Sequence, residues 1–103
     1  MELLTQELRE QLPPLYSQEH EQDPMVYAKF FHPLANWTWY ATEGSPEGDD
    51  FIFFGWVYGD VPELGYFSLN EMEGVQVMGL GIERDEHFSP TILSEVKKLH
   101  EHS

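Results

Sequence analysis

Leucines recur every four residues near the start of the chain. Leu4, Leu8 and Leu12 lie on one helical face, and two prolines directly after Leu12 prevent the helix from continuing. Thr5, with a glutamate two residues later, is typical of a helix N-terminus. The pattern predicts a short opening helix, followed by a polar loop over residues 16–24.

The middle of the chain carries β-branched and aromatic residues in short runs, separated by residues that favour turns. These runs predict four strands, over residues 25–31, 37–42, 51–58 and 64–67. The connections between them have hairpin length, and the second one runs from Gly44 to Asp50. Connections this short favour an antiparallel meander.

Two further helices are expected after the fourth strand. Ser68 begins a capping-box pattern, which predicts a short helix that ends at Gly74. Ser89 with a proline after it predicts the N-terminus of a closing helix. Its apolar stripe consists of Ile92, Leu93, Val96 and Leu99. The pairing of residues 74–85 stays open.

These elements predict one α+β domain over residues 1–103. A four-stranded antiparallel meander forms the sheet, and the N- and C-terminal helices cover one of its faces. A length of 103 residues suits a single hydrophobic core. With 41% hydrophobic and 15% aromatic residues, the composition is that of a folded domain.

The charge of the chain is strongly negative and narrows the classes of partner. Nineteen acidic residues against five basic ones give a formal net charge of −14, which repels phosphate backbones and anionic lipids. The absence of cysteine excludes disulfides and thiolate metal sites. No signal-like start and no membrane-length apolar run is present, so we expect a cytoplasmic protein that binds neither nucleic acid nor membranes.

The expected topology gathers acidic segments at one end of the sheet. In an up-and-down meander, alternate connections lie at the same end, which places the loop before the first strand beside the second connection. The short helix after the fourth strand follows nearby. We therefore predict an acidic partner-binding pole with Glu43, Glu47, Asp49 and Asp50 at its centre and Glu19, Glu21, Asp23, Glu71 and Glu73 as its rim.

The aromatic run at residues 37–40 and the acidic residues also admit other interpretations. Trp37 and Trp39 share one face of a strand and can floor a ligand pocket, although a place in the core is the commoner role. Paired carboxylates serve glycoside hydrolysis. However, an exposed turn keeps both groups ionised, and no phosphate loop or nucleophile motif is present. We therefore expect no enzyme and no cofactor.

Histidines raise the question of a metal site. His100 and His102 flank a glutamate, and His87 follows two acidic residues. A histidine pair at a chain end is more often a solvated tail. The acidic residues around Gly48 do not have the ligand spacing of an EF-hand. Whether the terminal histidines bind metal stays open.

Six motifs are spread along nearly the whole chain: LLT at residues 3–5, LPPLY at 12–16, NWTWYATE at 36–43, ELGYFSL at 63–69, IERD at 82–85 and LSEV at 93–96. Together they resemble a small bacterial family of uncharacterised domains. The resemblance implies carriage on plasmids, phages and integrative elements. It implies no enzymatic activity and supplies no catalytic residues.

Clustered carboxylates on a rigid domain suggest mimicry of nucleic acid. Duplex DNA carries one negative charge per ~1.7 Å of axis, and a protein with similar charge density can occupy a cationic groove. We therefore hypothesise a non-catalytic inhibitor of a cationic host defence protein, of anti-CRISPR or anti-restriction type. The alternatives are an acidic surface that only confers solubility, an adaptor that uses an aromatic patch with Tyr40 or Tyr58, and a small carboxylate- or metal-dependent hydrolase. The oligomeric state is not predicted.

Overall fold

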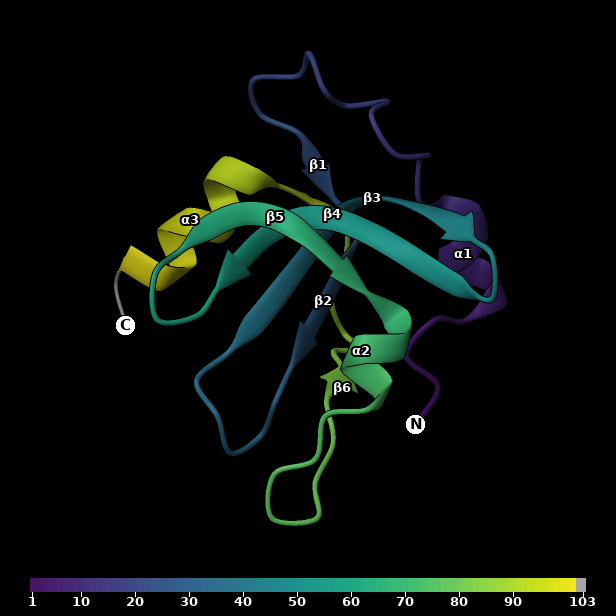
Figure 1. Cartoon of the computed structure of the whole chain (residues 1–103). Helices are drawn as coiled ribbons and strands as arrows, with labels where there is room; N and C mark the ends of the chain where they lie inside the picture. Colours follow the sequence, from purple (N-terminus) through teal and green to yellow (C-terminus); the bar gives the residue numbers. More distant parts are fainter. Residues whose placement is uncertain (102–103) are drawn as a thin grey trace.

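The computed structural model describes residues 1–101 and contains a five-stranded antiparallel sheet with three helices (Figure 1). The strands lie in the order β5-β4-β3-β2-β6. Their bounds are β2 (Ala28–Phe31), β3 (Thr38–Glu47), β4 (Asp50–Tyr58), β5 (Glu63–Ser68) and β6 (Glu83–Arg84). The α+β class and the meander of β2 to β5 are confirmed. The count of four strands was one too few, because β6 pairs antiparallel with β2.

The predicted first strand divides at Tyr27. β1 (Met25–Val26) pairs with β7 (Thr91–Ile92) in a separate two-stranded ladder, while β2 continues into the main sheet. β7 occupies the positions where the closing helix was expected to begin, so the predicted N-cap at Ser89 was wrong. The helix α3 (Leu93–Glu101) begins where Asp23 accepts hydrogen bonds from the backbone N–H (2.8 Å) and the hydroxyl (2.6 Å) of Ser94.

The β3–β4 hairpin is much longer than predicted. The expected loop from Gly44 to Asp50 is mostly strand, and only two residues separate Glu47 from its cross-strand partner Asp50. Gly48 in this turn has φ of 58°, a conformation that glycine adopts without steric cost. The residues from Gly44 onward have weak β-propensity, which led to the wrong prediction of a loop. Packing overrides this propensity. At Gly44 the packing is so close that an added Cβ would meet the Phe51 ring and a methyl of Leu12.

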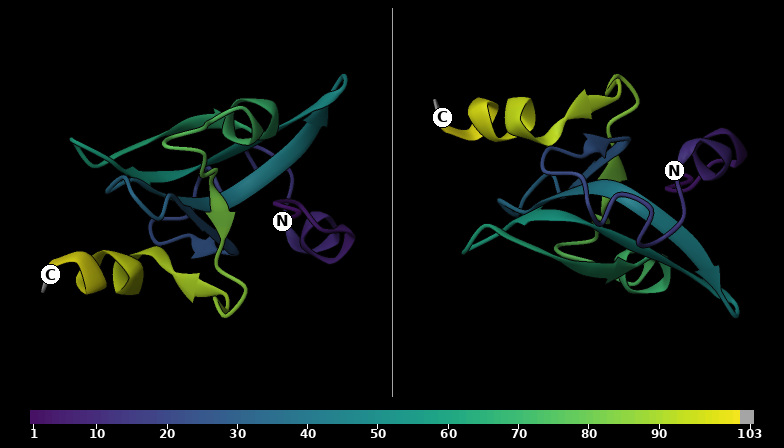
Figure 2. Two further views of the ribbon diagram at one scale, coloured as in Figure 1. Left: turned by 90° about the horizontal axis from the view of Figure 1, so that it is seen from below. Right: turned by 90° about the horizontal axis from the view of Figure 1, so that it is seen from above.

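The two faces of the sheet carry separate hydrophobic clusters. Phe51 and Phe53 of β4 pack in the cluster that contains Leu8 of α1 (Gln6–Gln11) and Met72 of α2 (Leu69–Glu73). Trp56 packs in the other cluster, together with two residues of α3. Because successive strand residues point to opposite faces, α1 and α3 cover opposite faces of the sheet and not the same one. In both views of Figure 2, α1 and the tip of the β3–β4 hairpin lie toward one end of the molecule and α3 lies toward the other end.

The capping signals at Thr5 and Ser68 hold as predicted. Thr5 Oγ1 accepts a hydrogen bond from the Leu8 N–H at 3.1 Å, and Ser68 Oγ accepts one from the Glu71 N–H at 3.0 Å. α2 ends at Gly74. None of the helices in residues 1–101 is both long and apolar enough to cross a membrane.

Candidate functional site

The nine carboxylates of the predicted acidic pole lie in three segments, which the structure brings together only in part. Asp50 Oδ1 accepts a hydrogen bond from the Asn70 N–H at 3.0 Å, so the base of the β3–β4 turn lies against α2 with Glu71 and Glu73. In Figure 1 the loop over residues 13–24 arches above β1, away from both the turn and α2. Glu19, Glu21 and Asp23 therefore form a separate acidic group.

Glu43 is buried, against the expectation of an exposed turn. Its side chain is 4% exposed, and its carboxylate accepts hydrogen bonds from the backbone N–H of Tyr16 (2.9 Å) and of Gln18 (2.6 Å). Bonds from N–H groups to a carboxylate are strong and offset the cost of burying the charge. Glu43 therefore fixes the loop onto the sheet and does not lie at the centre of a surface.

Two more of the nine carboxylates, Asp23 and Asp50, hold helices in place. The hydrogen bonds from Ser94 lower the pKa of Asp23, and the bond from the Asn70 backbone is the largest cause of the lowered pKa of Asp50. Both groups stay ionised while they anchor α3 and α2. The carboxylates that remain as exposed surface are Glu19, Glu21, Glu47, Asp49, Glu71 and Glu73, which we call the six exposed carboxylates.

None of these six exposed carboxylates forms an ion pair within residues 1–101. Within residues 1–101, ion pairs join Lys29 to Asp85 (3.7 Å) and Lys98 to Glu95 (3.3 Å), and neither pair includes any of the six. Their charge is therefore exposed to solvent and is not compensated by an ion pair.

Sequence reasoning missed a tyrosine pair on the same side of the molecule as Glu43. Tyr16 has φ of 73°, a left-handed conformation that residues other than glycine seldom adopt. Its ring is 62% exposed and that of Tyr66 on β5 is 57% exposed. A hydrogen bond with the Tyr16 side chain is the largest cause of the raised pKa of Tyr66, and both side chains line the same cleft.

Apolar neighbours extend this pair into a continuous surface. Phe54 packs edge to face on Tyr66 with 4.8 Å between ring centroids, and Leu64 is 54% exposed. Together Tyr16, Phe54, Leu64 and Tyr66 line a cleft of about 350 Å³, and we call these four residues the tyrosine surface. The alternation of Leu64 and Tyr66 along the predicted fourth strand was the available signal, whereas nothing in the sequence pointed to Tyr16.

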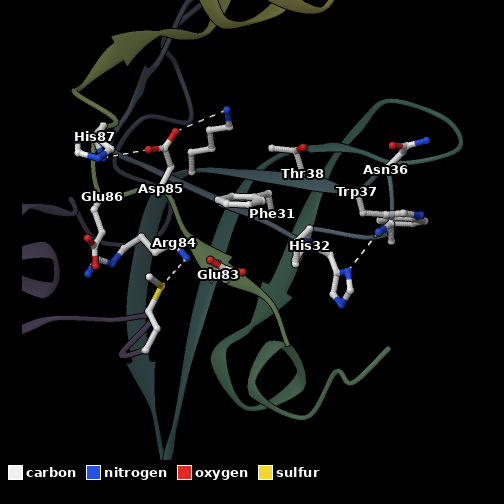
Figure 3. A pocket seen from close by; sticks show the side chains of 14 residues that line it. Phe31, His32, Asn36, Trp37, Thr38, Glu83, Arg84, Asp85, Glu86 and His87 are labelled. Atoms are coloured by element: carbon white, nitrogen blue, oxygen red, sulfur yellow. Dashed lines mark hydrogen bonds and ion pairs between the residues drawn. The ribbon is translucent and has the colours of Figure 1, made fainter. Parts of the chain in front are cut away.

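A second hollow lies on the sheet beside β6 (Figure 3). The strand register places Thr38, Phe31 and Glu83 in one row across β3, β2 and β6. Lys29 and Asp85 stand in the next row and form an ion pair. The resulting pocket has a volume of about 540 Å³. In Figure 3 Phe31 and Thr38 lie between Trp37 on one side and His87 with Asp85 on the other.

The aromatic patch that was proposed around Tyr40 is not on the surface. Tyr40 is 2% exposed, and its hydroxyl lies 2.6 Å from Nε2 of His100. Burial raises the pKa of Tyr40 to about 12 and lowers that of His100, so this hydrogen bond joins a neutral phenol to a neutral imidazole. Tyr58 stacks on the same imidazole with 4.0 Å between centroids. Of the run at 37–40, Tyr40 is core and Trp37 is 38% exposed.

The other histidine with a defined role is structural. His32 is 4% exposed, its Nδ1 accepts from the N–H groups of Leu34 and Ala35, and its Nε2 lies 2.9 Å from the Leu80 carbonyl. Among residues 1–101 no three histidine or carboxylate side chains are grouped to hold a metal ion. His102, one of the proposed ligands, lies outside the described residues.

Comparison with known proteins gives a family. Residues 3–101 match the family described as protein of unknown function, DUF2958, and the chain belongs to it. No curated protein and no solved structure matches the chain. The family description assigns no activity, so a function has to be argued from the surface itself.

Proposed function

We propose that this member of the DUF2958 family is a non-catalytic acidic protein that binds a cationic, nucleic-acid-binding protein in place of nucleic acid. The observation that carries the proposal is the set of six exposed carboxylates, none of which forms an ion pair in the described chain. A net charge of −14 on 103 residues adds long-range attraction for a basic surface. Nucleic acid offers the same partner a similar array of negative charge.

The carboxylates at the hairpin turn stand on a rigid base. Glu47 and Asp49 lie at the end of a hairpin whose strands are paired without interruption from Glu43 to the turn, and Asp50 ties that hairpin to α2. Rigid charges lose little conformational freedom on binding, which favours affinity. We assign the turn and α2 as the charged contact, with Glu19 and Glu21 as a second group.

The proposed partner is a host defence protein. Resemblance to domains carried on mobile elements supports this assignment, since such elements meet CRISPR effectors and restriction enzymes in the host. Both classes bind DNA through basic channels, which an acidic protein can occupy. Cytoplasmic location belongs to the same proposal.

The proposal is tested with a panel of purified CRISPR effector nucleases and restriction endonucleases. We expect the wild-type protein to inhibit DNA cleavage by at least one of them at about 50 mM salt, and to lose that inhibition at about 500 mM, where the Debye length is a few ångströms. Inhibition that is equal at both salt concentrations contradicts the electrostatic mechanism.

Charge-reversal variants test which carboxylates make the contact with the partner. Glu47→Lys with Asp49→Lys is expected to abolish inhibition. Asp60→Lys with Glu86→Lys changes the net charge equally at exposed positions elsewhere, and it is expected to retain inhibition. Equal losses in the two double variants show that only net charge matters and refute the assigned contact.

A second candidate is an adaptor that binds through apolar area. The tyrosine surface favours it, because Tyr16, Leu64 and Tyr66 are each more than half exposed. Such an adaptor binds its partner with little dependence on salt, and Tyr66→Ala weakens binding while Glu47→Lys does not.

A further inference from the structure

β5 is an open edge of the sheet. It pairs with β4 on one side, and within residues 1–101 no strand pairs with its other side. A Cβ added at Gly65 would also meet no atom within 4 Å, so the face of the sheet that Gly65 points to is uncovered at this position. Proteins usually protect such edges with lysine, proline or a bulge, and β5 contains none of these.

The tyrosine surface borders this open edge. Leu64 and Tyr66 alternate along β5 and therefore point to the same face. Tyr66 contacts Phe54 on β4 and lines one cleft with Tyr16 of the loop, so one apolar surface runs from the strand edge to the loop. A strand that pairs with β5 would lay its alternate side chains on this surface.

Tyr16 is exposed on a backbone conformation that is unfavourable and that other residues of the fold hold in place. The backbone of Tyr16 is left-handed, and Glu43 is buried to hold its N–H and that of Gln18. Backbone strain of this kind is unfavourable and concentrates at functional sites. Here the result is a phenol ring that is 62% exposed, which contributes little to the core.

The charges around the cleft identify the kind of ligand. Glu19, Glu21 and Glu43 line it together with the tyrosine surface, and Lys97 is the one cation among the described lining residues. Tyrosine faces attract guanidinium groups, and carboxylates bind them with two hydrogen bonds. A second copy of this chain is the wrong occupant, because each copy carries a net charge of −14.

We propose that β5 and the tyrosine surface bind an extended, arginine-rich segment of the partner, which adds to the sheet as a strand beside β5. Main-chain hydrogen bonds to the β5 edge supply the register, and alternate arginines lie over Tyr16 and Tyr66 toward Glu19 and Glu21. This inference rests on the proposed function for the basic character of the partner, and it deepens that function by naming the segment and the site.

Synthetic peptides test the site directly. The probe has about eight residues in which arginine alternates with valine or threonine, long enough to form one strand. A matched peptide has glutamate in place of arginine. Two further peptides carry N-methyl groups on alternate backbone nitrogens, one in each register. Binding is measured by isothermal titration calorimetry, and amide hydrogen exchange follows the protection of β5.

We expect the arginine peptide to bind and to slow exchange of the β5 amides. N-methylation in one register should weaken binding at least about tenfold, since it removes the donors that face β5. Equal binding of both N-methylated peptides overturns strand addition. Equal binding of the glutamate peptide overturns the charge argument, and a dimer paired through β5 in the absence of peptide overturns the choice of occupant.

Single substitutions at exposed positions distinguish an effect on peptide binding from an effect on the stability of the fold. Tyr66→Ala and Tyr16→Ala should each weaken the arginine peptide by about tenfold or more, as for aromatic anchors in other interfaces. Val61→Ala is the matched control, because Val61 is 70% exposed in the connection before β5. Unchanged binding by both tyrosine variants overturns the inference.

The two proposals fail in different ways. Nuclease inhibition that survives Tyr66→Ala but is lost on Glu47→Lys with Asp49→Lys removes the β5 site and leaves the proposed function intact. Peptide binding at β5 without inhibition of any nuclease leaves the site and removes the proposed function.

Discussion

The carboxylate of Glu43 fixes residues 16–18 of the loop to the sheet. Glu43 is 4% exposed, and its carboxylate accepts backbone hydrogen bonds from Tyr16 and Gln18. In Glu43→Gln the amide NH₂ replaces one acceptor, so one buried N–H loses its partner. We expect the free energy of unfolding to fall by about 1–3 kcal/mol, measured by urea denaturation with an unchanged m-value.

The matched control for this prediction is Glu47→Gln in the same strand. Glu47 is exposed at the hairpin turn, and its substitution is expected to change stability by less than about 0.5 kcal/mol. If the two variants lose equal stability, the hydrogen bonds of Glu43 do not hold the loop.

The sequence singled out Glu43 as a candidate contact residue but did not predict its structural role. Glycine, serine and proline follow it, and this composition is typical of a turn. The register shift between Ala41 and Glu43 and the partners of Glu43 in the loop at residues 16–18 are tertiary features. No local pattern encodes them, so the burial of this carboxylate was not predictable.

At the scale of elements, two glycines that face each other across β4 and β5 have opposite surroundings. A Cβ at Gly55 would lie 1.7 Å from the Tyr40 carbonyl oxygen, whereas one at its partner Gly65 meets nothing within 4 Å. Gly55→Ala is expected to destabilise the fold by about 3 kcal/mol or more. Gly65→Ala should be neutral or stabilising by up to about 1 kcal/mol.

Thermal unfolding followed by circular dichroism checks both variants under one condition. A similar loss of Tm in the two variants contradicts the steric argument, because only Gly55 has backbone in the way.

The packing of α3 predicts a dependence of stability on pH. Burial, and next the charge of Lys29, hold the pKa of His100 below its usual value. The unfolded chain therefore takes up the proton first as pH falls. Stability should be complete above the unfolded pKa of about 6.5 and should decrease as pH falls from there toward the folded pKa.

Urea denaturation between pH 7.5 and 5 measures this slope. His100→Gln keeps an acceptor for the Tyr40 hydroxyl and removes the titration, so its slope should be flatter in that interval. His20→Gln in the exposed loop should leave the slope as in the wild type. An identical slope in His100→Gln contradicts the assignment to His100.

Elements with local signals were predictable, and those that depend on distant pairing were not. Caps at Thr5 and Ser68 and the runs of β4 and β5 gave the correct positions. β1, β6 and β7 have two residues each and exist through partners far along the chain. The same pairing moved the start of α3 to Leu93.

On the whole molecule, charge and apolar surface occupy different places. Glu47 and Asp49 lie at one end, at the hairpin turn, while Tyr16 and Tyr66 meet where the loop crosses the sheet. Composition predicted the exposed negative charge, because a chain with a net charge of −14 cannot bury most of that charge when it folds. It could not predict the apolar surface, since the tyrosine surface forms only when the loop lies on β4 and β5.

The net charge also predicts how salt affects the isolated protein. With the ion pairs Lys29–Asp85 and Lys98–Glu95 as the ones found in residues 1–101, repulsion among carboxylates exceeds attraction. Salt screens exposed charges over a Debye length of about 10 Å at 0.1 M. We therefore expect Tm to rise between about 0.01 M and 0.3 M sodium chloride, and Asp60→Lys with Glu86→Lys to reduce that rise. If the Tm of the wild type falls with salt, attractive ion pairs dominate the surface. That result contradicts net repulsion among the carboxylates. It also contradicts the view that the exposed carboxylates are available to a partner.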